Sequence, residues 1–214
     1  MEDHRTDRLG VLLDQLGFAR EIAQARLGGL ASPASLPKGA PLPPRADEGP
    51  LTDQEYLWEP APGAWSIRRR GQAASPRPYG PGEWQLDGAI GDPDPTPVTT
   101  IAWRLGHLHS DVAGRWEWTF GERRRPPDQL VDFSPSAAVA LERFWAALDR
   151  WGASVAAVTG EQLDTVGFGQ CPWTDDAEVP FITVIWEANL ELIHHMAEIA
   201  LLRDLYRTRP VGAR

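Results

Sequence analysis

The sequence predicts an all-α protein, a four-helix bundle with a proline-rich insertion that carries a small β-hairpin between helices 1 and 2. Four long stretches repeat apolar residues every three or four positions, which is the period of a helix. The segment 33–97 holds 14 of the 20 prolines, so long helices are excluded there. The 214 residues, 42% of them hydrophobic, fit one domain of ordinary size. We therefore expect a single helical bundle domain over residues 1–214.

The first helix is predicted from about Asp7 to Leu30. Gly28-Gly29 and Pro33 mark its end. The apolar residues at helical spacing are Leu9, Leu12, Leu13, Leu16, Ala19, Ala23, Leu27 and Leu30.

The proline-rich insertion contains weaker signals of regular structure. Thr52 has the character of an N-cap and could open a short helix that ends near Trp58. The segments 64–68 and 83–87 alternate apolar and polar residues, which predicts a small antiparallel hairpin. Two interpretations of this hairpin stay open: a flap over a pocket, or a surface excursion that only covers the bundle.

The second helix is predicted to start near Thr99 or Thr100 and to end at Gly121. His107 and His109 flank its apolar stripe on opposite sides, so the periodicity does not choose between them as functional residues. The stripe consists of Ile101, Leu105, Leu108, Val112 and the stem of Arg115.

The last two helices have clear start signals. Ser134 is the predicted N-cap of the third helix, with Pro135 at its first position and Gly160 at its end. Pro180 opens the fourth helix, which reaches about Arg207. Four such helices predict an antiparallel four-helix bundle.

Composition excludes several classes of partner. The net charge of −9 argues against nucleic-acid binding and against attraction to anionic membranes. No run of about 18 apolar residues is present, and no apolar segment of a signal peptide follows the N-terminus, so we expect a cytoplasmic location. Cys171 is the sole cysteine, and we favour a small buried or loop residue over a nucleophile at this position.

Glu191 and His195 stand one turn apart on the fourth helix. A carboxylate and an imidazole at that spacing share a face and can chelate one divalent metal ion. A third ligand would have to come from elsewhere in the chain, from His4, His107 or His109. A plain ion pair between Glu191 and His195 is the alternative.

Three segments together resemble the DinB/YfiT-like superfamily of four-helix metalloproteins. Their order and spacing carry the resemblance, which spans nearly the whole chain. The segments are LTDQEYLW with a following Trp-Ser (51–58 and 65–66), TTIAWRLGHL (99–108) and ELIHHMAEIALLRDLY (191–206).

The resemblance implies a metal site formed by His107, Glu191 and His195. The family's histidine on the second helix follows a Trp by four residues, which selects His107 over His109. The last helix of the family usually carries two histidines four residues apart, and here Glu191 replaces the first of them. A Glu is found at the equivalent place in the mycothiol-dependent maleylpyruvate isomerase branch. His194 is then expected to be a packed residue or one that supports a metal ligand.

Other polar residues near these positions are expected to have mainly structural or surface roles. His109 is expected on a helix face. Glu198 could support His195, although a solvated face is the favoured interpretation. Arg203 and Asp204 are expected to form structural ion pairs.

The resemblance also implies an activity. Family members of known chemistry are thiol-dependent transferases or isomerases, which implies a metal-dependent enzyme that uses mycothiol or bacillithiol and acts on a small-molecule electrophile. A divalent metal is implied as cofactor, with zinc or nickel favoured. Two alternatives stay open: a metal-dependent hydrolase, and a non-enzymatic metal-binding, stress-related protein. A homodimer is compatible with the sequence.

Overall fold

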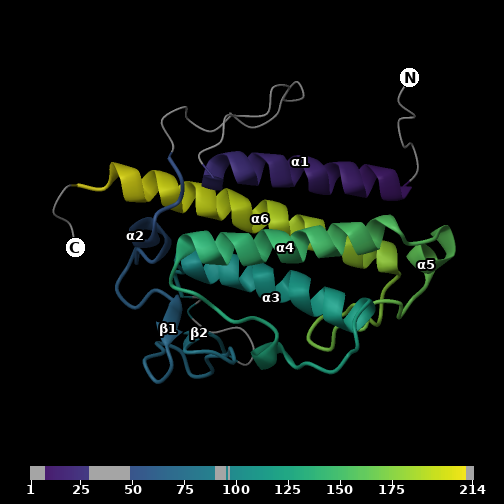
Figure 1. The fold of residues 1–214 in the computed structure, drawn as a ribbon, viewed down its shortest axis with the longest axis horizontal. Coiled ribbons are helices and arrows are strands. Elements are labelled where there is room, and N and C mark those ends of the chain that lie inside the picture. The colour runs from purple at the N-terminus through teal and green to yellow at the C-terminus, as the bar shows by residue number, and fades with distance from the viewer. Residues whose placement is uncertain (1–7, 29–48, 90–94, 96, 211–214) are drawn as a thin grey trace.

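Four long helices form a bundle in the computed structural model, which describes residues 8–28, 49–89, 95 and 97–210 (Figure 1). This confirms the predicted fold class. The long helices are α1 (Arg8–Gly28), α3 (Ile101–Thr119), α4 (Ala137–Ala156) and α6 (Phe181–Thr208). The predicted ends of the first helix, residues 7 and 29–30, lie outside the described residues, as does His4. None of the described helices is both long enough and apolar enough to cross a membrane.

The sequence predicts an antiparallel bundle, but one pair of neighbouring helices is parallel. Two ion pairs show that α3 and α6 are antiparallel. Arg104 near the start of α3 pairs with Glu198, whereas Arg115 near its end pairs with Glu187. Helices α3 and α4, by contrast, run in the same direction (Figure 1). The reason is that residues 120–136 run back along the bundle before α4 begins.

The core is built from the predicted apolar stripes. Trp151 of α4 and Leu192 of α6 are completely buried, and burial of a side chain of this size stabilises the fold by about 1.5–3 kcal/mol. The stripe predicted for the second helix is buried along its length, including Arg115. Other fully buried members of the core are Phe144, Val155, Phe181, Val184 and Ile185.

Helix α4 begins two residues later than the sequence predicted. Its N-cap is Ser136, while the hydroxyl of Ser134 accepts a hydrogen bond from the Ser136 backbone N–H at 3.2 Å. Asp53 of the short helix α2 (Asp53–Tyr56) accepts from the Ala137 N–H at 2.7 Å. A side chain far away in sequence therefore caps this helix, which local signals cannot reveal.

The end of α4 also differs from the prediction. The helix stops at Ala156, and Thr159 opens the separate short helix α5 (Gly160–Asp164). Thr159 and Gln162 form a reciprocal capping box, which favours a new helix start over continuation of α4.

The insertion packs against the first turns of α3. Strands β1 (Ile67–Arg69) and β2 (Trp84–Leu86) form the predicted antiparallel hairpin, with Ile67 opposite Leu86. Gly106 of α3 permits this packing, because a Cβ atom at that position would lie 2.8 Å from a methyl carbon of Leu86. The hairpin therefore lies directly on the helix that carries His107.

Two ion pairs, one of them buried, join the C-terminal half of α6 to α1 and α2. The guanidinium of Arg203 is fully buried and donates to Glu55 of α2 at 2.8 and 3.2 Å. Arg26 of α1 pairs with Asp204 at 3.2 Å. Both contacts confirm the structural ion pairs expected for Arg203 and Asp204.

Candidate metal centre

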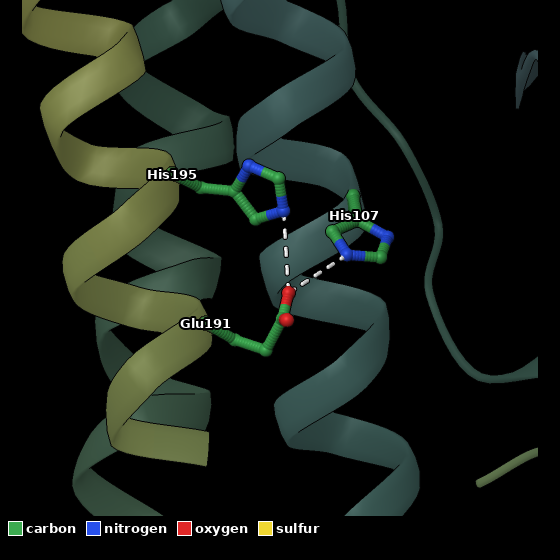
Figure 2. Close-up of side chains that lie close together, drawn as sticks. All are labelled: His107, Glu191 and His195. Atoms are coloured by element: carbon green, nitrogen blue, oxygen red, sulfur yellow. Dashed lines mark hydrogen bonds and ion pairs between the residues drawn. The ribbon is translucent and has the colours of Figure 1, made fainter. Parts of the chain in front are cut away.

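His107, Glu191 and His195 converge at the seam between α3 and α6 (Figure 2). The Oε2 atom of Glu191 lies 3.3 Å from Nε2 of His107 and 3.2 Å from Nε2 of His195. One donor atom from each residue lies within 4.8 Å of the other two. The three residues that the sequence singled out thus face a common point.

The helix geometry explains the convergence. Glu191 and His195 occupy successive turns of α6 and project from one face, and the antiparallel packing of α3 places His107 opposite them. The side chain of His195 is 11% exposed, whereas those of His107 and Glu191 are 34% and 35% exposed. The cluster is therefore buried on the His195 side and open to solvent on the other.

A second carboxylate holds the ring of His195. Glu198 Oε2 lies 2.5 Å from Nδ1 of His195, on the ring nitrogen that does not face Glu191. Glu198 also pairs with Arg104 of α3. Nη1 of Arg104 also lies 3.1 Å from Nδ1 of His195, but a protonated Nδ1 that donates to Glu198 cannot accept from Arg104, so the carboxylate is the partner of both groups. The solvated role favoured for Glu198 is wrong, and its role in supporting His195 is the one the contacts support.

The ring of His107 is held by aromatic stacking. It lies parallel to the indole of Trp103, with ring centroids 5.2 Å apart and an interplanar angle of 4°. The indole Nε1 of Trp103 donates to the backbone carbonyl of Asp87 at 2.8 Å, and its ring also contacts Trp65. The insertion therefore fixes the position of His107 through Trp103.

The contacts change the proton affinity of both α6 residues. Hydrogen bonds from His107 and His195 hold the pKa of Glu191 well below its ordinary value. Burial by itself would lower the pKa of His195, but hydrogen bonds to Glu191 and Glu198 outweigh burial and raise it. A doubly protonated His195 ring can donate to both carboxylates at once.

The arrangement fits a divalent metal ion. Two donors bound to one ion at about 2.0–2.2 Å lie about 3–3.5 Å apart, which matches the two distances between Glu191 and the histidines. The pairing of His195 with Glu198 is the carboxylate–histidine arrangement that commonly supports metal-ligating histidines. Within the described ranges, no other group of three His, Cys, Asp or Glu side chains meets the same distance criterion.

The other two helical histidines do not belong to the cluster. His109 sits on the α4 side of α3, edge-on to Phe144, and burial together with Arg143 and Arg150 lowers its pKa to about 4. His194 is not packed in the core: its side chain is 61% exposed. It stacks on His195 and lies 3.5 Å from Glu198, so it contacts one residue of the cluster and the carboxylate that supports it.

Cys171 is buried, as expected. It is 1% exposed, and burial raises the pKa of its thiol to about 12. A thiol in this state is protonated at neutral pH and cannot act as a nucleophile.

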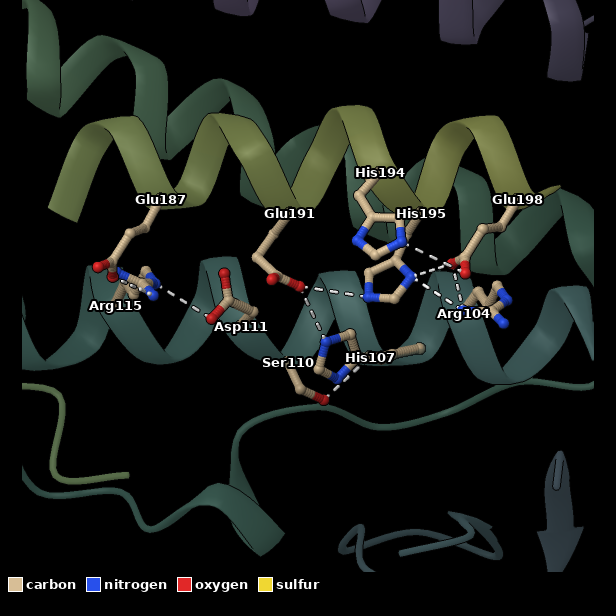
Figure 3. A network of polar contacts seen from close by, with 11 residues as sticks. Arg104, His107, Ser110, Asp111, Arg115, Glu187, Glu191, His194, His195 and Glu198 are labelled. Carbon is tan, nitrogen blue, oxygen red and sulfur yellow. Dashed lines mark hydrogen bonds and ion pairs between the residues drawn. The ribbon is translucent and has the colours of Figure 1, made fainter. Parts of the chain in front are cut away.

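Sequence reasoning missed Arg104, which connects Glu198 to α3. Figure 3 places it in a row of polar side chains between the two helices, with Arg115 near the opposite end. Arg115 pairs there with Asp111 of its own helix and Glu187 of α6. The signal was available in principle, because Arg104 stands one turn before His107 and shares its face of α3.

A protein-family model, described as DinB superfamily, matches residues 76–199, which is more than half of the chain. The matched range includes all three residues of the cluster. Comparison with curated proteins and with solved structures finds no match.

Proposed function

Because this chain belongs to the DinB superfamily and gathers His107, Glu191 and His195 at one point, we propose that it is a metal-dependent enzyme of the thiol S-transferase or isomerase type. Its thiol would be a low-molecular-weight compound such as mycothiol or bacillithiol. Its second substrate would be a small electrophile.

The number of protein donors is the observation that carries this proposal. Structural zinc sites are usually closed by four protein ligands, whereas catalytic sites use three and keep a position open. The cluster offers three donors, and two of the side chains that supply them are about one-third exposed. A substrate atom could therefore reach the centre from the solvent side.

His107, Glu191 and His195 would hold the ion through two imidazole nitrogens and one carboxylate oxygen. This donor set suits zinc, nickel, iron or manganese, and we propose zinc or nickel. When bound, a divalent ion would lower the pKa of a coordinated thiol and so make thiolate available at neutral pH.

The surrounding residues would orient the donors. Glu198 keeps a proton on Nδ1 of His195, which leaves Nε2 of that ring directed at the centre. Arg104 balances the charge of Glu198. Trp103 fixes the plane of the His107 ring, so that its Nε2 faces Glu191.

The nucleophile would come from the external thiol. Cys171 is buried, its thiol has a pKa of about 12, and it lies outside the cluster. The sulfur of the bound thiol would form a bond to the electrophilic carbon, and the thiol proton would pass to solvent. In a transfer reaction the leaving group departs from that carbon, whereas in an isomerisation the sulfur itself leaves after the rearrangement.

Thiol consumption by untagged protein tests the proposal. We expect zinc- or nickel-loaded wild-type protein to accelerate the loss of mycothiol or bacillithiol in the presence of a chloronitroaromatic electrophile. The His195→Ala variant should lose this activity, and the exposed Arg124→Gln variant should keep it. Hydrolysis of esters or amides without thiol turnover would replace the proposal by a metal-dependent hydrolase. Metal binding without thiol consumption, thiol-dependent isomerisation or hydrolysis would leave a non-enzymatic metal-binding protein.

A further inference from the structure

A polar cavity lies on the α4 side of α3, away from the interface with α6. It has a volume of about 360 Å³ and is bounded by α3, α4 and the segment that includes residues 125–132. This size falls at the lower end of the range typical of small-molecule sites. Its polar lining residues are Arg125, Arg143, Arg150, Asp132 and His109.

Positive charge exceeds negative charge around this cavity. Arg125 pairs with Glu117 at 3.0 Å, and Arg143 pairs with Asp132 at 3.3 Å. Arg150, by contrast, has no carboxylate partner among the described residues. Of the three arginines that line the cavity, two thus have carboxylate partners and Arg150 has none, which leaves one positive charge uncompensated in a protein whose net charge is −9.

Arg150 contacts an aromatic ring, and none of its N–H groups donates to another residue within the described ranges. Its guanidinium carbon lies 4.8 Å from the centre of the Trp116 ring. A guanidinium that stacks through its face keeps its N–H groups free at the edge. Arg150 can therefore still donate to an anion.

The rest of the cavity lining consists of apolar side chains and of His109. Trp116, Leu130, Val131 and small side chains such as Ala113 line the walls. The ring nitrogens of His109 have no hydrogen-bond partner within the described part of the chain, although the residue lines the cavity. A cavity with apolar walls and one excess positive charge favours a ligand that is apolar and singly negative.

We propose that this cavity binds a small organic monoanion, a carboxylate with a compact apolar body. Arg150 and Arg143 would receive the carboxylate, since guanidinium groups bind carboxylates through paired N–H donors. The apolar body would lie against Trp116 and the neighbouring aliphatic side chains. An inorganic anion would leave those walls without a partner. The proposal is independent of the metal centre, which lies on the α6 side of α3.

Nuclear magnetic resonance titration of chelator-treated protein tests this site. Benzoate is the probe, and benzamide is its neutral counterpart of the same shape. Removal of divalent metal prevents binding of the carboxylate at the His107 cluster. We expect benzoate to cause saturable shifts in the amide signals of Ala113, Ala146 and Ala147, and benzamide to cause none.

Substitutions then identify the groups that bind. Arg150→Gln should weaken benzoate binding about tenfold or more, as expected for loss of a charge-assisted hydrogen bond. Arg143→Gln should weaken it as well. Arg124→Gln is the matched control, because Arg124 is exposed and does not line the cavity. Equal binding of benzamide, unchanged affinity in both cavity variants, or no saturable shift with millimolar benzoate would overturn the proposal.

Discussion

The carboxylate of Glu198 lies 2.5 Å from Nδ1 of His195, while Nε2 of the same ring lies 3.2 Å from Glu191. The two nitrogens of one imidazole thus have separate partners, which fixes both the orientation of the ring and the nitrogen available to an ion. Glu198 is a positioning residue for the centre, and its effect can be separated from that of the ligands themselves.

Replacement of Glu198 by alanine should weaken metal binding without abolishing it. Loss of a supporting carboxylate typically lowers metal affinity by about 10–100-fold. We would measure zinc affinity by competition with a chromophoric chelator. Arg124→Gln is the control, because Arg124 is exposed and is not part of the cluster. An affinity for Glu198→Ala equal to that of wild type would contradict this role.

Metal binding should become weaker as the pH falls. The pKa of His195 is raised above its ordinary value of 6.5, and an ion at Nε2 must displace the proton that the carboxylates stabilise. In metal-free protein, the stabilising effect of this raised pKa is fully present below about pH 6.5 and is lost as the pH rises through the folded-state value. The increase in melting temperature caused by zinc should therefore shrink between about pH 8 and pH 6.

Calorimetry of zinc binding in buffers of different ionisation enthalpy provides the check. We expect proton release when zinc binds to wild-type protein near neutral pH, and neither zinc binding nor proton release in His195→Ala. A zinc effect on melting temperature that is constant over this pH range, with no proton release, would argue against His195 as a ligand.

Cys171 should be inert in the folded protein. Its thiol is buried and has a pKa of about 12, so almost no thiolate forms at pH 8. A thiol reagent should label it only after denaturation, and Cys171→Ser should keep any thiol-transfer activity. Rapid labelling of native protein, or loss of activity in Cys171→Ser, would restore Cys171 as a candidate nucleophile.

The pair between Arg203 and Glu55 should be important for stability. Removal of one partner from a buried ion pair costs about 3–5 kcal/mol, because the remaining charge is left without compensation. We expect Arg203→Met to lower the free energy of unfolding by an amount near the lower end of this range. The reason is that Arg207 also lies 3.4 Å from Glu55 and partly compensates its charge. Urea unfolding measures the change. The matched control is Arg69→Gln on the hairpin, an exposed arginine whose loss should leave the transition midpoint unchanged.

The helices were predictable because their signals are local. The stripe of Ile101, Leu105 and Leu108 follows directly from helical periodicity, and all three side chains are buried. The start of α4 was not predictable, because Asp53 of another helix provides its cap. The parallel course of α3 and α4 depends on the path of the connecting segment, about which periodicity carries no information.

The candidate site likewise contains residues that the sequence could predict and residues whose roles depend on contacts between helices. The spacing of Glu191 and His195 placed them on one face, and the resemblance to the family selected His107. Glu198 and His194 were harder to assign, because both are partly exposed polar residues on the same helix as His195. Two contacts distinguish Glu198 as a support for the ring: its carboxylate reaches Nδ1 of His195, and it pairs with Arg104 across the interface on α3.

Metal content per chain is the measurement that tests the central claim most directly. Untagged wild-type protein, His107→Ala and His195→Ala would be equilibrated with zinc or nickel, separated from free ion and analysed by mass spectrometry, with thermal unfolding recorded in parallel. We predict one ion per wild-type chain, none in either variant, and folded protein in all three cases, because the bundle is held by its apolar core. Wild-type protein that binds no divalent metal, or variants that bind as much as wild type, would contradict the account.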